Sequence, residues 1–177
     1  KRLQKIIEPY REMIHCPNGF DPEIFYDKNQ RNGKLKIGWA GNEKDACKGI
    51  NDIIRPACGD EFELHIAGGN LNQQEMAEFY NEIDVLCVAS SAEGEPLTLI
   101  ESMACGCFSV CTDVGIVPEL IRDTDNGLIV ERSIEAFREA FSRCRENLTE
   151  IREKGRNNAE QLKETRTWKN VAPIFER

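Results

Sequence analysis

From residue 35 onward, apolar residues fall into short runs with the spacing and length of β-strands. Leu35, Ile37 and Trp39 occupy alternate positions, and Gly41 follows them as a strand-ending residue. Four further apolar runs of strand length lie at residues 62–67, 84–89, 107–111 and 127–130. The run at 84–89 is continuously apolar, which is typical of a strand covered on both faces of its sheet.

Between these runs, apolar residues recur at helical spacing. A helix is predicted after Asn72, which can cap it together with Glu75 in a variant of the capping box. A second helix is predicted after Ser133. Their apolar faces consist of Met76, Phe79, Tyr80 and Ile83 in the first and Ile134, Phe137, Phe141 and Cys144 in the second. Further helices are predicted at 49–58, from Pro96, at 117–121 and through the C-terminal segment, with a break at Gly155.

Strands that alternate with helices along a chain build βαβ units and a parallel sheet. We therefore predict an α/β fold with an open, doubly wound, Rossmann-like parallel sheet. Sheets of this kind bind ligands beyond the carboxyl ends of their strands. The chemistry is accordingly expected in the loops that follow the strands.

The 177 residues suffice for one domain, since a domain takes ~100–200 residues. We assign 1–15 to a terminal helix or the remnant of a preceding domain. Residues 16–33, rich in turn formers, are assigned to a linker and entry loop, and 34–177 to the Rossmann-like domain with its C-terminal helices. Because the chain does not begin with Met, we expect it to be part of a longer protein.

Charge and composition exclude several classes of protein. The net charge is -8 and the pI is about 5.0, which argues against broad binding to nucleic acid phosphates. No apolar run approaches the ~18–20 residues of a membrane-spanning helix, and the N-terminal residues do not resemble a signal peptide. We expect a cytoplasmic protein.

The eight cysteines do not form a metal site of recognisable spacing. None is part of a CxxC pair, and the chain has only two histidines. Several of the cysteines lie within apolar runs, where a free thiol behaves as a small apolar side chain. We interpret the thiols as reduced and expect neither a disulfide framework nor a metal.

The candidate chemistry concentrates between residues 90 and 106, where a strand is followed by a helix. The N-terminus of a helix is an anion site because its first N–H groups are unpaired and the helix dipole is positive there. Glu93 precedes this helix and Glu101 lies on it. Carboxylates accept hydrogen bonds from the hydroxyl pairs of a ribose or a hexose. Two carboxylates beside an anion site therefore suit a sugar nucleotide. Glu95, which such an anion would repel, is expected to point outward.

The two glutamates, and a histidine elsewhere in the chain, can also be interpreted as purely structural residues. Glutamates near helix N-termini are favourable with the dipole alone, and two glutamates eight positions apart are common. His65 lies within an apolar strand, where a buried, hydrogen-bonded histidine is favoured over a catalytic base.

The order of motifs between residues 93 and 130 resembles family 4 glycosyltransferases of the GT-B fold, in their C-terminal half. The resembling motifs are Glu93-Gly94, Glu101-Ser102-Met103-Ala104-Cys105-Gly106, Thr112-Asp113-Val114-Gly115, Pro118-Glu119-Leu120-Ile121 and Asn126-Gly127-Leu128-Ile129-Val130. Weaker similarities are Pro17-Asn18-Gly19-Phe20-Asp21 and Phe25 to the family's interdomain linker, Lys48-Gly49 to a Lys-Gly pair, and Trp168 to its C-terminal tail. The family consists of retaining enzymes that use nucleotide-sugar donors and carry two glutamates separated by seven residues.

The resemblance implies a role for each matching position. Glu93 would contact the donor sugar near the reacting face, and Lys48 would neutralise the diphosphate and stabilise the leaving group. Glu101 would hold the ribose diol. The diphosphate would be surrounded by Gly94, Pro96, Leu97 and Thr98. No cofactor is implied beyond the nucleotide-sugar substrate.

Two departures from the family pattern concern the phosphate contacts. The family often has an arginine soon after the first strand, where this chain has Asn42, with Lys44 nearby. Lysine is not equivalent to a bidentate arginine. Pro96 stands where a glycine is usual. Asn42 and Lys44 are still assigned to the donor site.

The resemblance leaves the acceptor to a preceding domain, where a glycan or lipid-linked glycan would bind; peripheral membrane contact of a full-length protein is left open. A nicotinamide-dependent dehydrogenase would need a G-x-G-x-x-G motif after a strand, which the glycines of this chain do not supply. A phospho-receiver would need an aspartate at the end of a strand, whereas Asp84 begins one. A degenerate domain that binds a nucleotide or a protein without catalysis remains an alternative.

Overall fold

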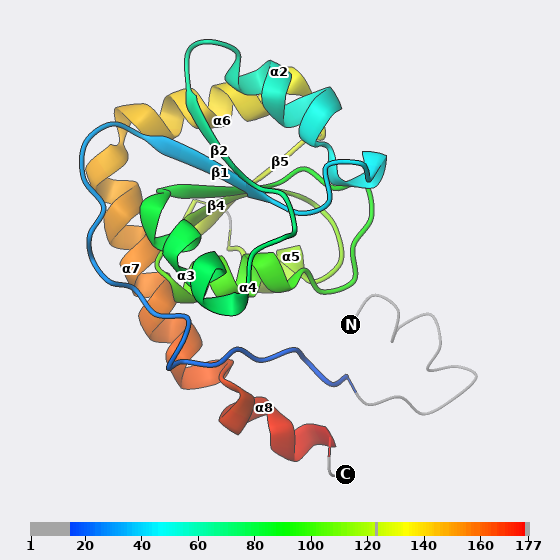
Figure 1. The fold of residues 1–177 in the computed structure, drawn as a ribbon, viewed down its shortest axis with the longest axis vertical. Helices are drawn as coiled ribbons and strands as arrows, with labels where there is room; N and C mark the ends of the chain where they lie inside the picture. The colour runs from blue at the N-terminus through cyan, green and yellow to red at the C-terminus, as the bar shows by residue number, and fades with distance from the viewer. Residues whose placement is uncertain (1–14, 123, 176–177) are drawn as a thin grey trace.

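The structure, a computed structural model, describes residues 15–122 and 124–175. Its centre is a sheet of five parallel strands in the order β2-β1-β3-β4-β5. The strands are β1 (Lys36–Ala40), β2 (Glu63–Ala67), β3 (Val85–Val88), β4 (Phe108–Thr112) and β5 (Gly127–Val130). All five lie within two residues of the predicted runs, and the predicted doubly wound α/β fold is confirmed (Figure 1).

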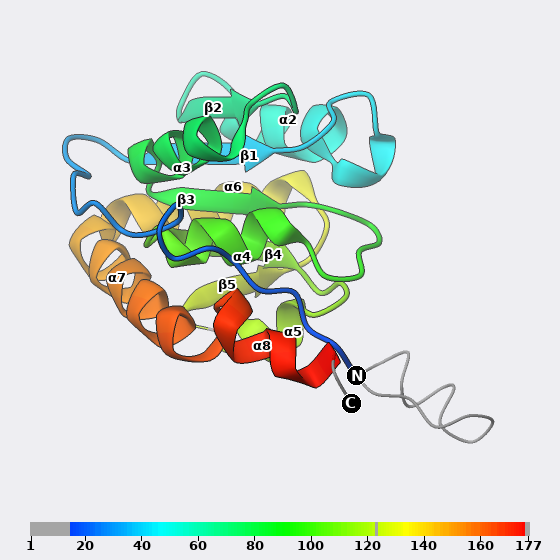
Figure 2. The same cartoon turned by 60° about the horizontal axis from the view of Figure 1, so that its bottom comes forward.

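Helices cover both faces of this sheet. Figure 2 shows α3 and α4 in front of the strands and α6 behind them. The helical elements are η1 (Ala46–Lys48), η2 (Ile50–Ile54), α2 (Arg55–Cys58), α3 (Gln73–Glu82), α4 (Leu97–Ala104), α5 (Val117–Leu120), α6 (Ile134–Glu146), α7 (Leu148–Thr165) and α8 (Trp168–Phe175). The helix predicted at 49–58 is therefore a succession of short helical turns.

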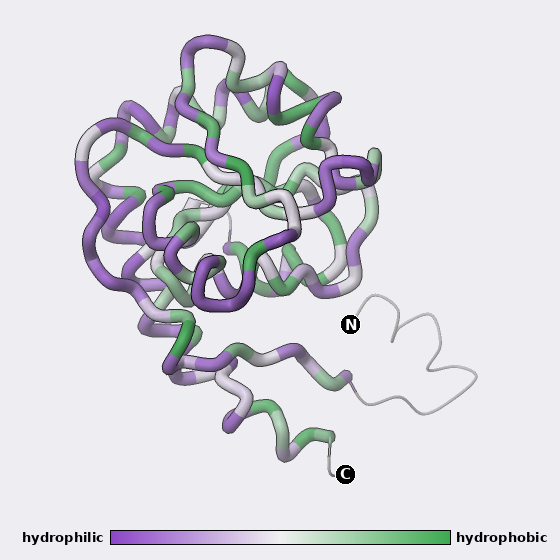
Figure 3. Tube along the Cα trace, viewed as in Figure 1, coloured by the Kyte–Doolittle hydropathy of each residue, from purple (hydrophilic) through white to green (hydrophobic). Residues whose placement is uncertain are grey.

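The core is divided into two apolar layers by the sheet. Trp39 and Cys87 face the layer beneath η2, α2 and α6, whereas Leu86 and Val88 face the layer beneath α3 and α4. Alternate residues of β3 thus point to opposite layers, and all four are buried. The double coverage explains why this strand is continuously apolar, and Figure 3 shows the sheet as largely hydrophobic while polar residues follow the outer loops and α7.

The predicted cap of α3 is present in full. The Asn72 side chain accepts a hydrogen bond from the Glu75 N–H at 3.0 Å, and the Glu75 carboxylate accepts one from the Asn72 N–H at 2.8 Å. Replacing Asn72 with alanine is expected to lower the free energy of unfolding by ~1 kcal/mol, because a first-turn N–H loses its acceptor. Urea unfolding measures this loss. Gln73→Ala, at an exposed position in the same turn, is the control, and equal effects of the two variants would contradict the capping role.

The predicted break at Gly155 is wrong, because α7 runs without interruption from Leu148 to Thr165. A Cβ atom on Gly155 would lie 2.1 Å from the carbonyl oxygen of Gly106. Glycine is needed there because α7 packs directly against the backbone that leads into β4, not because the helix ends. The helix instead ends before Thr167, and Pro173 lies inside α8.

Residues 16–33 form no helix, and their only pairing of strand type is an isolated bridge between Phe20 and Thr167. Phe20 and Phe25 are buried, and Figure 1 shows this segment running past α7 while α8 projects away from the sheet. The element predicted at 1–15 falls almost wholly outside the described residues. Within the described part of the chain, no helix has the length and apolar character needed to cross a membrane.

Candidate functional site

The strand order places one topological switch point between β1 and β3. The chain leaves β1 toward β2 on one side, and β3 then returns to the other side of β1. The loops after these two strands both lie at the carboxyl edge of the sheet, which is where open α/β sheets bind ligands. The residues that follow β1 and β3 are those for which chemistry was predicted.

Lys48 and Glu93 meet at this edge of the sheet. The Lys48 Nζ atom lies 2.5 Å from Glu93 Oε1, and the Ser90 hydroxyl donates to the same oxygen at 2.7 Å. The two charged side chains are 31% and 13% exposed, respectively. Their ion pair brings together residues 45 positions apart, as the predicted site requires.

The loop that carries Lys48 is fixed to the end of β3 by its backbone. The Ser91 N–H donates to the Cys47 carbonyl at 2.9 Å, and the Trp39 indole N–H donates to the Lys48 carbonyl at 3.3 Å. Gly49 has a φ of 72°, and a Cβ atom there would lie 2.5 Å from the Ala89 carbonyl oxygen. Only glycine permits this approach, so the Lys-Gly pair sets the position of the lysine.

The loop after β4 supports Gly94 from the other side. The Ile116 N–H donates to the Gly94 carbonyl at 3.0 Å. Gly115 has a φ of 49°, and a Cβ atom on it would lie 2.0 Å from that carbonyl oxygen. A side chain at position 115 would therefore displace the loop that carries Glu93 and Gly94.

The N-terminus of α4 opens next to this loop. Pro96 is its N-cap residue, one position before the predicted place in the first turn, and supplies no side-chain cap. Leu97 is 44% exposed, and Thr98 is half-buried. The first turn thus presents its N–H groups without a side-chain acceptor, as an anion site does.

Glu101 is half-buried one turn further along α4. The Tyr80 hydroxyl donates to Glu101 Oε2 at 3.1 Å. Burial raises the pKa of the Glu101 carboxyl, and the Tyr80 hydrogen bond opposes that rise because it favours the charged form. One carboxylate oxygen is thereby oriented, while the other has no partner among the described residues.

The predicted outward orientation of Glu95 is wrong. Its carboxylate accepts from the Asn18 N–H at 2.9 Å and lies 2.5 Å from the Arg166 guanidinium. The side chain is only 13% exposed. Glu95 avoids the anion site by pairing with a cation on the C-terminal segment, which the local sequence alone does not reveal.

Asn42 and Lys44 are not brought into contact with the two glutamates. The Asn42 side chain accepts from the Lys44 N–H at 3.1 Å, so it is used within its own turn. Both side chains are exposed, and across 15–122 and 124–175 neither has a hydrogen bond or ion pair to Lys48, Glu93 or Glu101. His65 is hydrogen-bonded as predicted, to Glu63 at 2.8 Å, but is half-buried rather than fully buried.

Three residues of the site were not predicted. Ser90 and Tyr80 bind the two glutamate carboxylates, and Arg132 donates to the carbonyls of Ala89 and Ala46. Ser90 and Arg132 follow β3 and β5, so the expectation that chemistry lies after strands could have identified them. Tyr80 was assigned only to the core face of its helix, and nothing local marks its hydroxyl.

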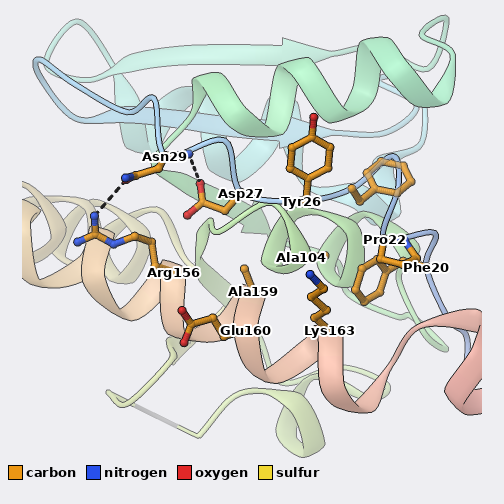
Figure 4. Close-up of a pocket in the computed structure, with 11 residues that line it drawn as sticks. Phe20, Pro22, Tyr26, Asp27, Asn29, Ala104, Arg156, Ala159, Glu160 and Lys163 are labelled. Atoms are coloured by element: carbon orange, nitrogen blue, oxygen red, sulfur yellow. Dashed lines mark hydrogen bonds between the residues drawn. The ribbon is translucent and has the colours of Figure 1, made fainter.

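A cleft of about 370 Å³ lies elsewhere, between residues 20–29 and α7. Figure 4 shows Tyr26 and Asp27 on one side and Arg156, Glu160 and Lys163 on the other. It contains none of the predicted site residues. Within the described residues, no three His, Cys, Asp or Glu side chains are grouped as metal ligands.

The sequence of the chain is similar to those of known glycosyltransferases. A profile of the family described as glycosyl transferases group 1 matches residues 61–162. An uncharacterized glycosyltransferase of Methanocaldococcus jannaschii is 29% identical over 136 residues, which is 66% of this chain and 38% of that protein. The chain spans less than half the length of the curated relatives it matches.

Solved structures share the fold. The C-terminal domain of a glycosyl transferase group 1 family protein from Francisella tularensis matches with a TM-score of 0.66 at 21% identity, over 81% of this chain and 96% of that one. Anabaena HepE in complex with UDP and glucose matches with a TM-score of 0.73 at 16% identity, over 93% and 55%. The fold is therefore that of a GT-B C-terminal half, and the chain belongs to the glycosyl transferases group 1 family.

Proposed function

We propose that this chain is the donor-binding domain of a retaining glycosyltransferase that moves a hexosyl group from a nucleoside-diphosphate sugar to an acceptor hydroxyl. The observation that carries the proposal is the meeting of Lys48 and Glu93 at the switch point, next to the N-terminus of α4. A cation, two carboxylates and a helix N-terminus match the charges and hydroxyls of such a donor. The UDP and glucose bound by Anabaena HepE, which shares the fold, support the same ligand class.

The proposal gives each group a separate task. Lys48 and the first turn of α4 bind the diphosphate, and Lys48 stabilises the charge that develops on it as the sugar leaves. Glu101, whose Oε1 atom has no partner among the described residues, accepts hydrogen bonds from the ribose diol. Glu93 accepts from the sugar hydroxyls, so donor binding exchanges the Lys48–Glu93 ion pair for two ligand contacts.

The remaining parts of the enzyme are assigned by the same proposal. Residues 16–33 connect the domain to a preceding acceptor-binding domain, and the acceptor is a glycan or lipid-linked glycan. We assign the reaction to the cytoplasm, where eight thiols would stay reduced.

Calorimetric titration of the chain with UDP, GDP and ADP, each beside its nucleoside, tests the proposal. Tighter binding of one diphosphate than of its nucleoside is expected and would identify the base. If none binds to this chain or to a longer form with its preceding domain, the donor-binding proposal fails. That result would favour the degenerate domain, which the exposed Asn42 at the position of a usual arginine also suggests.

Glu101→Gln is expected to weaken nucleoside and nucleoside diphosphate binding equally, by ~1–2 kcal/mol, because the lost acceptor contacts the ribose that both share. Calorimetry measures both losses. Glu82→Gln, an exposed carboxylate at the end of α3, is the control. A loss confined to the diphosphate would contradict the ribose assignment.

The same variant is expected to raise the melting temperature at neutral pH. The pKa of Glu101 is higher in the folded chain than in the unfolded chain. At pH values between these two pKa values, the folded chain therefore binds more protons than the unfolded chain. Stability attributable to Glu101 is therefore present below the unfolded pKa and lost as the pH rises through the folded pKa. Glutamine avoids this loss, and scanning calorimetry of both proteins at pH 4 and pH 7 would show the gain at pH 7 only.

A further inference from the structure

Glu95 links the loop before α4 to two distant segments of the chain. Its Oε2 atom accepts from the Asn18 N–H at 2.9 Å, and its Oε1 atom lies 2.5 Å from Arg166 Nη1. Glu95 and Arg166 are 13% and 15% exposed, which is far below the exposure of a solvated ion pair. Neither contact is local, since the sequence separations are 77 and 71 residues.

Asn18 and Arg166 belong to one paired unit, which we call the crossover and define as residues 18–20 with 166–168. The Phe20 N–H donates to the Arg166 carbonyl, and the Trp168 N–H donates to the Phe20 carbonyl, each at 3.1 Å. A Cβ atom on Gly19 would lie 2.9 Å from the Trp168 nitrogen, so the two segments of the crossover are in close contact. Figure 1 shows these segments side by side below the sheet.

Residues 93–95, which we call the donor loop, are thus bound to three different parts of the molecule. The Glu93 side chain pairs with Lys48, the Gly94 carbonyl accepts from Ile116, and the Glu95 side chain binds the crossover. Glu95, which binds the crossover, is separated from Glu93, which pairs with Lys48, by only one residue.

We propose that Glu95 is a positioning residue that couples the donor loop to the crossover. The binding of a nucleoside diphosphate and the docking of the crossover against Glu95 then affect each other. The inference rests on the proposed function. Any such coupling is reciprocal, because each event changes the free energy of the other by the same amount.

The two tryptophans of the chain report on the two ends of this coupling. Trp39 is buried and donates to the Lys48 carbonyl, whereas Trp168 is 46% exposed at the crossover. Labelling with 5-fluorotryptophan gives one ¹⁹F resonance for each. Arg166→Ala is expected to shift the Trp39 resonance as well as that of Trp168, with no ligand present.

Asp27→Asn is the matched control. Asp27 forms an ion pair with Arg31 and is 12% exposed, at the far end of the same irregular segment. This variant is expected to leave the Trp39 resonance unchanged. A folded Arg166→Ala protein with the wild-type Trp39 resonance would overturn the coupling, and Arg166→Lys serves in its place if the alanine variant does not fold.

Affinity supplies an independent readout. If Glu95 acted only through its charge, Glu95→Ala would strengthen binding of the anionic diphosphate, because a negative charge is removed. A positioning role predicts the opposite, a loss of about fivefold or more in affinity for UDP, GDP or ADP, with partial recovery in Glu95→Gln. Unchanged or tighter binding by Glu95→Ala overturns the proposal.

Titration of the labelled wild-type protein separates this inference from the proposed function. The diphosphate that binds is expected to shift both tryptophan resonances, and Glu95→Ala to abolish only the Trp168 response. A shift of Trp39 alone in the wild type would overturn the coupling and leave donor binding intact. If no diphosphate shifts Trp39, in this chain or in a longer form with its preceding domain, while Arg166→Ala does, the donor assignment fails and the structural coupling stands.

Discussion

Replacing Arg152 with methionine is expected to lower the free energy of unfolding by about 3–5 kcal/mol. Arg152 Nε donates to Asp84 Oδ1 at 2.8 Å, and the Asp84 side chain is only 1% exposed. Without the arginine, that carboxylate stays buried with the Lys36 N–H, at 2.9 Å, as its remaining partner. Denaturant unfolding measures the change, which corresponds to a fall of about 10 °C in melting temperature for a domain of this size.

The loss should come from the unpaired charge rather than from the missing side chain. In the double variant Asp84→Asn, Arg152→Met, no charge is buried and asparagine can still accept from Lys36. We therefore expect much of the lost stability to return, a coupling that a double-mutant cycle measures. Arg156→Met, one turn along α7, is the control, because Arg156 is exposed and its hydrogen bond goes to the exposed Asn29 amide oxygen. Its effect is expected within about 0.5 kcal/mol. Equal effects of the two arginine substitutions would refute the buried-charge argument.

Asp84 also shows what the sequence could and could not predict. The apolar run that follows it predicts β3, because a strand covered on both faces admits only apolar side chains. The role of its carboxylate depends on Arg152, which lies 68 residues away. The spacing of residues along the chain predicts strands, helices and caps. Which residue of a distant helix a side chain will bind depends instead on how the folded chain packs. Gly155 was misread for the same reason, since its requirement comes from the backbone of Gly106.

The candidate site likewise combines features that the sequence predicts with contacts that it does not. That Lys48, Glu93 and the start of α4 lie at one edge of the sheet was predictable, because all of them follow parallel strands. The contacts that orient the two glutamates come from Ser90, which its place after β3 could have identified, and from Tyr80, whose hydroxyl has no sequence signal of its own. Glu95 was placed in solvent because its neutralising arginine is 71 residues away.

Lys48→Ala is expected to weaken binding of the preferred nucleoside diphosphate by about 2–3 kcal/mol, or roughly 30- to 150-fold, through loss of a charge-assisted contact to the anion. The matching nucleoside has no phosphate, so its affinity should not change. Calorimetry with both ligands measures the difference. Lys34→Ala, at an exposed position before the amino end of β1, is the control, and an equal loss for nucleoside and diphosphate would refute the phosphate role of Lys48.

The Lys48–Glu93 ion pair leads to a prediction of opposite sign for Glu93. In the structure Glu93 both occupies the Lys48 ammonium and places a negative charge beside the anion site. Glu93→Gln removes that competition, so it should bind the free diphosphate more tightly than the wild type, whereas Lys48→Ala binds it less tightly. In the full-length enzyme proposed above, the same Glu93→Gln variant should transfer sugar more slowly, because it lacks the carboxylate that we propose contacts the reacting sugar. Tighter product binding combined with slower turnover would separate a residue that acts on the sugar from one that holds the phosphate, and weaker diphosphate binding by Glu93→Gln would contradict this division of roles.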